Sequence, residues 1–142
     1  LAYAPGMVKI VSQLDEFTCM CGGVKMTFYR FPFDLTYTAS LDAIIKMPDL
    51  LTLAAMKAYA LGGRAKWKDY VDLYFIMKRF HTYPEVVEAA RRNFAGEFNE
   101  KLFRIQLHYF DDVNYQEEVE FMPGFEAPME EIKKALVEFS LS

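Results

Sequence analysis

One acidic residue in an otherwise apolar and aromatic run, Asp72, most constrains how this chain can fold. Between Tyr70 and Met77 the sequence reads YVDLYFIM, and Asp72 is its one polar side chain that is not aromatic. Burying an unpaired carboxylate costs several kcal/mol. Asp72 must therefore be solvated, paired with a cation, or part of a functional site.

Helical spacing suggests how this carboxylate is accommodated. A helix over residues 66–80 places Lys68 and Asp69 on about the same side as Asp72, because they precede it by four and three residues. On spacing alone, Lys68 and Asp72 form an exposed i,i+4 pair that contributes about 0.2–0.5 kcal/mol. Two apolar stripes flank this charged face: Trp67, Tyr70, Val71 and Tyr74 on one side, and Leu73, Ile76, Met77 and Phe80 on the other.

A second helix precedes this one. It begins near Asp49 and ends at the pair Gly62-Gly63, and Lys57 is its one cation in an otherwise apolar run. The turn over residues 62–65 predicts an αα-hairpin. We expect the hairpin to carry Lys57 and Arg64 towards the charged face of the following helix.

The periodicity of the chain changes near Pro48 from strand-like to helical. Residues 7–14 and 24–31 alternate as strands do, joined by a connection over residues 15–23. Helical patterns follow at 49–62, 66–80, 84–95, 98–109 and 127–140. The prediction is an α+β fold in which a small β-sheet element (7–31) is followed by a helical bundle (48–142), with residues 1–142 as a single domain.

Composition excludes some classes of protein. The net charge is −4 and the pI about 5.2, so the chain as a whole carries no electrostatic signature of nucleic-acid binding. Basic residues do gather locally, at Arg64, Lys66 and Lys68. No apolar run approaches the roughly 18 residues of a membrane span, and the C-x-C pair Cys19 and Cys21 predicts reduced thiols in a cytoplasmic protein.

Apolar content is high for a chain of this size. Hydrophobic residues make up 53% of the sequence and aromatic residues 16%. We expect part of this surface to be covered by self-association or by a missing N-terminal segment.

A series of short motifs resembles one bacterial family. Met56-Lys57, followed by Arg64-x-x-x-Lys68-Asp69-x-x-Asp72-Leu73-Tyr74, resembles the MK…RxxxKDxxDLY signature of the AbiEii-type nucleotidyltransferase toxins. VKMTFYRFPFD over residues 24–34 and HYFDDVNYQEEVEFMP over residues 108–123 are similar to further segments of that family. The resemblance runs from about Val8 to near the C-terminus.

This resemblance implies a polymerase-β-like fold and transfer of a nucleotidyl group from a nucleoside triphosphate to an acceptor such as tRNA. It also implies Mg²⁺ as cofactor of the intact protein, and an antitoxin as a partner. The metal-binding Gly-Ser loop and Asp-x-Asp motif of the family do not occur in this sequence. We therefore expect a C-terminal portion of a longer protein that, by itself, binds no metal and catalyses no transfer.

The resemblance also assigns roles to individual residues. Lys57 and Asp72 are the expected catalytic residues, with Asp72 orienting Lys57 or the acceptor. Lys57, Arg64 and Lys68 would bind the nucleotide phosphates. Asp69 would support them without touching the ligand, or cap Lys66.

A non-catalytic alternative stays open. The chain would then be a helical interaction module, either an inactive relative of the transferases or a truncated subunit that binds a protein partner through its aromatic surface. An upstream segment with the Gly-Ser and Asp-x-Asp motif would favour the enzyme.

Overall fold

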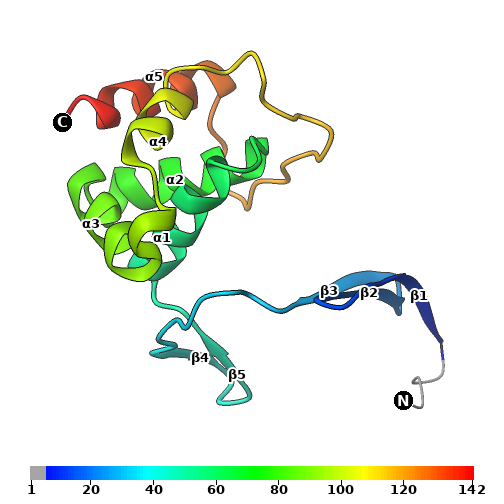
Figure 1. Cartoon of the computed structure of the whole chain (residues 1–142). Coiled ribbons are helices and arrows are strands. Elements are labelled where there is room, and N and C mark those ends of the chain that lie inside the picture. The colour runs from blue at the N-terminus through cyan, green and yellow to red at the C-terminus, as the bar shows by residue number, and fades with distance from the viewer. Residues whose placement is uncertain (1–5) are drawn as a thin grey trace. The chain divides into compact units, whose positions relative to one another are not determined.

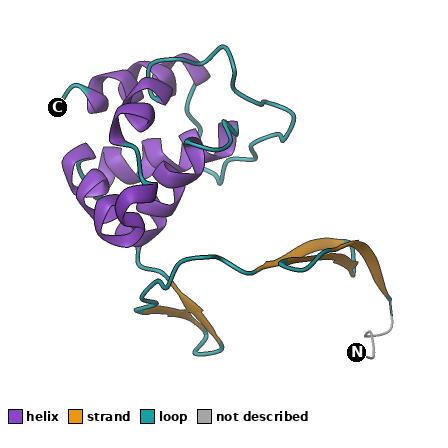
Figure 2. Cartoon of the chain, viewed as in Figure 1, coloured by secondary structure: helices purple, strands orange, loops and turns teal. Residues whose placement is uncertain are grey.

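The computed structural model describes residues 6–142 (Figure 1). The chain forms two compact units, with the boundary between Asp34 and Leu35. The first unit is a β-sheet, and the second is a short β-hairpin followed by helices (Figure 2). This is the α+β arrangement that the change of periodicity predicted. The assignment of residues 1–142 to a single domain stays a prediction.

The sheet of the first unit is antiparallel. Its strands are β1 (Met7–Ser12), β2 (Glu16–Cys21) and β3 (Val24–Tyr29), in the order β1-β2-β3. A two-residue turn joins β2 to β3, and Gly22 and Gly23 adopt positive φ angles of 57° and 81° there. Such a turn favours glycine at both positions.

The prediction of a plain connection over residues 15–23 was wrong, because that segment contains the central strand β2. The sequence of β2 does not alternate between apolar and polar residues, because both faces of the strand carry apolar side chains. Phe17 and Cys19 point to one side, and Met20 points to the other. Large apolar side chains on the outer strands remain exposed, among them Val8, Val24 and Phe28.

The second unit begins with a hairpin that the sequence did not predict, made of β4 (Ala39–Leu41) and β5 (Ile45–Met47). Its strands are too short for alternation to reveal them. Five α-helices and a 3-10 turn follow in the described chain: α1 (Leu50–Leu61), α2 (Trp67–Arg79), α3 (Tyr83–Phe94), η1 (Ala95–Glu97), α4 (Glu100–Gln106) and α5 (Met129–Ser140).

Local signals explain where the helices begin. The Asp49 side chain accepts a hydrogen bond from the Thr52 amide at 2.7 Å and caps α1. Thr82 and Glu85 form a capping box at the start of α3, with a proline in its first turn. The five predicted helices are therefore confirmed, with ends that shift by a few residues.

The core of the second unit forms around α2, which packs against α1 and α5. Tyr70, Leu73 and Tyr74 are at most 1% exposed, so both predicted apolar stripes of this helix are buried along most of their length. Phe80 is the exception, because α2 ends at Arg79 and leaves this ring 63% exposed.

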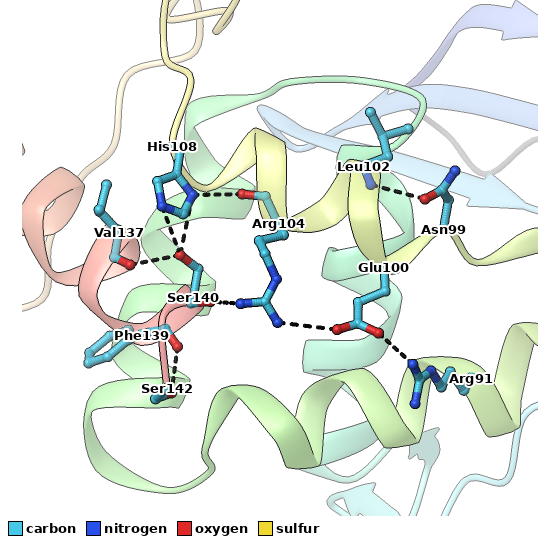
Figure 3. Close-up of polar contacts among 10 residues, drawn as sticks. All are labelled: Arg91, Asn99, Glu100, Leu102, Arg104, His108, Val137, Phe139, Ser140 and Ser142. Carbon is cyan, nitrogen blue, oxygen red and sulfur yellow. Dashed lines mark hydrogen bonds and ion pairs between the residues drawn. The ribbon is translucent and has the colours of Figure 1, made fainter.

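A polar network joins the last helix to α3 and α4 (Figure 3). The Glu100 carboxylate binds Arg91 at 2.5 Å and Arg104 at 3.2 Å, and Arg104 also donates to the backbone carbonyl of Ser140. His108 Nδ1 lies 2.9 Å from the Arg104 carbonyl oxygen and 3.3 Å from Ser140 Oγ. These contacts fix the C-terminal end of α5 against α4.

We expect Leu73→Ala to destabilise the second unit by about 2–5 kcal/mol, because it leaves a cavity in the core. Phe80→Ala should change the free energy of unfolding by about 0.5 kcal/mol or less, because that ring is mostly in solvent. Urea unfolding followed by circular dichroism measures both. Equal losses for the two variants would contradict this description of the core.

Candidate functional site

The charged residues of α1 and α2 meet in an ion-pair cluster centred on Lys57. Lys57 Nζ donates to Asp69 Oδ1 at 2.8 Å and lies 2.6 Å from Asp72 Oδ2. The Asp69 side chain is 3% exposed, that of Lys57 22%, and that of Asp72 48%. The prediction that the hairpin brings Lys57 to both carboxylates is confirmed, and Asp72 is paired.

The sequence of α1 permits this close approach. Ala54, Ala55 and Ala58 surround Lys57 in the chain, and all three are buried. Small side chains let α1 pack closely against α2 and α3, and the Lys57 ammonium group reaches two carboxylates on α2.

Arg64 adds a second cation to the buried carboxylate. Its Nε lies 3.3 Å from Asp69 Oδ2, an oxygen that makes no hydrogen bond within residues 6–142. Asp69 therefore lies between two cations, and its side chain contacts Lys57 directly. The alternative expectation was that Asp69 caps Lys66. The contact between these two residues is a backbone hydrogen bond, which the Asp69 amide donates to the Lys66 carbonyl.

Two effects act in opposite directions on the pKa of Lys57. Burial lowers this pKa, but hydrogen bonds to Asp69 and Asp72 outweigh burial and raise it above the usual value of 10.5. Lys57 thus remains a cation throughout the physiological pH range. A fixed, charged ammonium group suits the binding of an anion.

The pairing of Lys68 with Asp72 predicted from i,i+4 spacing was wrong. Lys68 Nζ lies instead 3.1 Å from Glu117 Oε2, and Lys66 Nζ lies 2.6 Å from Glu117 Oε1. Hydrogen bonds from Lys66 and Lys68 lower the pKa of Glu117 to about 2. Sequence reasoning missed Glu117, because no local spacing links residues that are about fifty positions apart.

Glu117 belongs to an irregular segment between α4 and α5, residues 107–128, which we call the acidic strap (Figure 2). It carries six acidic residues and no Lys or Arg. The strap is held at the start of α2, where the Trp67 amide donates to the Asn114 carbonyl at 3.0 Å and the Asn114 amide to the Ala65 carbonyl at 2.6 Å. The ring centroids of Trp67 and Tyr115 lie 5.5 Å apart.

A groove of about 490 Å³ separates the strap from the two helices. We call it the lysine groove; its lining residues are Lys57, Lys68, Val71, Asp72, Glu118, Val119 and Glu120. Three of the predicted site residues, Lys57, Lys68 and Asp72, therefore share one groove. Arg64 lines a different cavity of about 330 Å³, at the turn between α1 and α2.

The described residues do not by themselves fit a divalent cation. Within residues 6–142, no group of three or more His, Cys, Asp or Glu side chains is placed to hold a metal ion. The two carboxylates of the ion-pair cluster, Asp69 and Asp72, are both bound to Lys57. They serve to hold a cationic side chain.

A comparison with models of protein families shows which family this chain belongs to. A family model described as "Nucleotidyl transferase AbiEii toxin, Type IV TA system" matches residues 7–140. The chain belongs to this family. A partial polymerase-β-like fold is consistent with that membership, and the cluster of Lys57, Asp69 and Asp72 is formed by the motif residues of the resemblance. No curated protein and no solved structure matches the chain significantly.

Across the part of the chain that the structure describes, no helix combines the length and the apolar character needed to cross a membrane.

Substitution of the two carboxylates should have unequal effects on stability. Asp69→Asn removes the buried partner of Lys57 and should cost roughly 1–3 kcal/mol, whereas Asp72→Asn should cost about 0.2–1 kcal/mol because Asp72 is half exposed. Urea unfolding of both variants at pH 7 tests this order. A larger loss of unfolding free energy for Asp72→Asn would show that the exposed Lys57–Asp72 pair stabilises the cluster more than the buried pair does.

Proposed function

We propose that this chain supplies the phosphate-binding part of a nucleotidyltransferase that moves a nucleotidyl group from a nucleoside triphosphate to an acceptor such as tRNA. The observation that carries the proposal is the Lys57 ammonium group, held charged at the wall of the lysine groove by Asp69 and Asp72. Membership of the AbiEii family supports the reaction class.

In this proposal the two carboxylates have different tasks. Asp69 is buried, so it remains bound to Lys57 and fixes the position of the ammonium group. Asp72 is half exposed and can exchange its contact with Lys57 for one with the acceptor. A triphosphate oxygen can then approach Lys57 from the groove, where Lys68 adds a second positive charge.

The transfer itself conserves atoms and charge. A hydroxyl oxygen of the acceptor attacks the α-phosphorus, and the bond from that phosphorus to the β-phosphate bridging oxygen breaks. Pyrophosphate leaves with the electron pair, and the hydroxyl proton passes to solvent. Lys57 would stabilise the negative charge of the triphosphate during this displacement.

We further propose that an intact protein holds Mg²⁺ with its Gly-Ser and Asp-x-Asp motif and has an antitoxin partner. The proposal also includes self-association through exposed apolar residues and a cytoplasmic location. We expect transfer to require that motif, so nucleotide binding is the readout for this chain.

Binding of a nucleoside triphosphate should depend on Lys57. We expect Lys57→Met to weaken ATP binding at least about tenfold, which corresponds to about 1.4 kcal/mol, because the variant loses the fixed cation. Lys134→Met is the matched control, since Lys134 is 80% exposed on α5, and its affinity should stay within about twofold. Isothermal titration calorimetry at one salt concentration measures all three dissociation constants.

Two further variants separate loss of function from loss of fold. Lys57→Met combined with Asp69→Asn removes both charges of the buried pair, and it should bind as weakly as Lys57→Met. Asp72→Asn should bind ATP at least as tightly as the wild type, because it removes a negative charge from the groove. In a protein with the Asp-x-Asp motif, Asp72→Asn should nevertheless lose transfer.

The non-catalytic alternative makes a different prediction for the same experiment. An interaction module that uses its apolar surface would bind no ATP, or would bind it equally well in Lys57→Met and Lys134→Met. Either result would remove Lys57 from the mechanism. Exposed aromatic side chains, among them Phe28, Tyr29 and Phe80, are the observation that favours this alternative.

A further inference from the structure

Lys66 and Lys68 form a second cationic position at the start of α2. Both ammonium groups bind one carboxylate, with Lys66 Nζ at 2.6 Å from Glu117 Oε1 and Lys68 Nζ at 3.1 Å from Glu117 Oε2. Each lysine thus faces a different oxygen of the same anionic group. Two oxygens of a phosphate group have about the spacing of the two oxygens of a carboxylate, so a phosphate can replace Glu117 without moving the lysines.

The contacts of Glu117 can be displaced. Its side chain is 52% exposed, and those of Lys66 and Lys68 are 38% and 47% exposed. Exposed ion pairs contribute little to stability. The strap is anchored elsewhere, by the backbone hydrogen bonds of Asn114 and by the ring contacts of Phe121 and Phe125 with Phe75.

The acidic strap also determines the charge of this surface. Without its six acidic residues, the formal net charge of the chain would change from −4 to +2. Glu118 and Glu120 lie on the strap side of the lysine groove, opposite Lys57 and Lys68. The strap therefore places negative charge where a phosphate-bearing ligand would bind.

We propose that Lys66 and Lys68 form a second phosphate-binding site of this protein, which the Glu117 carboxylate occupies as an internal competitor until a phosphate group displaces it. The inference rests on the proposed function in that Lys68, which lines the lysine groove, belongs to both sites. The ligand chemistry is a phosphate group, carried by a triphosphate or by the backbone of a nucleic acid. Displacement frees the middle of the strap while its anchors at Asn114 and Phe125 stay bound.

Removal of the competitor should strengthen binding. We expect Glu117→Gln to bind inorganic triphosphate about two- to fivefold more tightly than the wild type, the range set by two weak exposed ion pairs. Glu88→Gln is the matched control, because Glu88 is exposed on α3 and the substitution makes the same charge change; its affinity should equal that of the wild type. In the triple variant Glu117→Gln, Lys66→Ala, Lys68→Ala, the gain should disappear.

The outcomes separate this inference from the proposed function. A gain in Glu117→Gln that persists when Lys57→Met is added supports the second site, even if Lys57 has no role in ATP binding. Equal affinities for Glu117→Gln and Glu88→Gln overturn the second site and leave Lys57 untouched. A gain that persists in the triple variant also overturns it.

Two probes distinguish the source of the phosphate. Inorganic triphosphate represents the nucleotide, and a short RNA hairpin with unphosphorylated ends offers backbone phosphates alone. A gain with both probes assigns the site to phosphate in general, and a gain with one identifies that source; no gain with either overturns the inference.

Hydrogen exchange provides a readout that needs no variant. Triphosphate bound by the wild type should speed amide exchange over residues 115–120, because Glu117 is released from the lysines. Exchange that slows or stays unchanged there at saturating triphosphate would show that phosphate does not displace the strap.

Discussion

The buried ion pair between Lys57 and Asp69 is the interaction on which the helical unit and its candidate site both depend. It joins α1 to α2 in a stretch of α1 where Ala54, Ala55 and Ala58 are buried. A carboxylate that is 3% exposed is tolerated only because Lys57 and Arg64 balance its charge. The same pair fixes a cation at the edge of a groove. Under the proposed function, stability and the binding of an anion therefore require the same two residues.

Much of the helical unit could be predicted from the sequence because its signals are local. Helical periodicity, the Gly62-Gly63 stop and the proline-containing start of α3 each act within a few residues. The sheet was harder to predict, since β2 is apolar on both faces and β4 and β5 are three residues long. The exposure of Phe80 depends on the helix ending at Arg79, which periodicity does not define to the residue.

The candidate site was predictable only in part. Lys57 could be expected near Asp69 and Asp72, because a short turn strongly constrains the two helices that it joins. The partner of Lys68 could not be predicted, since Glu117 reaches it across a long irregular segment whose path no local pattern determines. The six acidic residues over 107–128, with no Lys or Arg among them, indicate that the segment pairs with cations elsewhere in the chain. They do not indicate which cations these are.

The chemical shift of the Lys57 side-chain ammonium group, followed by NMR during titration with ATP, tests the central claim most directly. Because this group is held by Asp69 and Asp72, we expect its protons to exchange slowly with water before ligand is added. We then expect its resonance to move with the same dissociation constant that calorimetry gives, while the resonance of Lys134 stays in place. A Lys57 signal that exchanges as fast as that of Lys134 and does not move at saturating ATP would contradict the account.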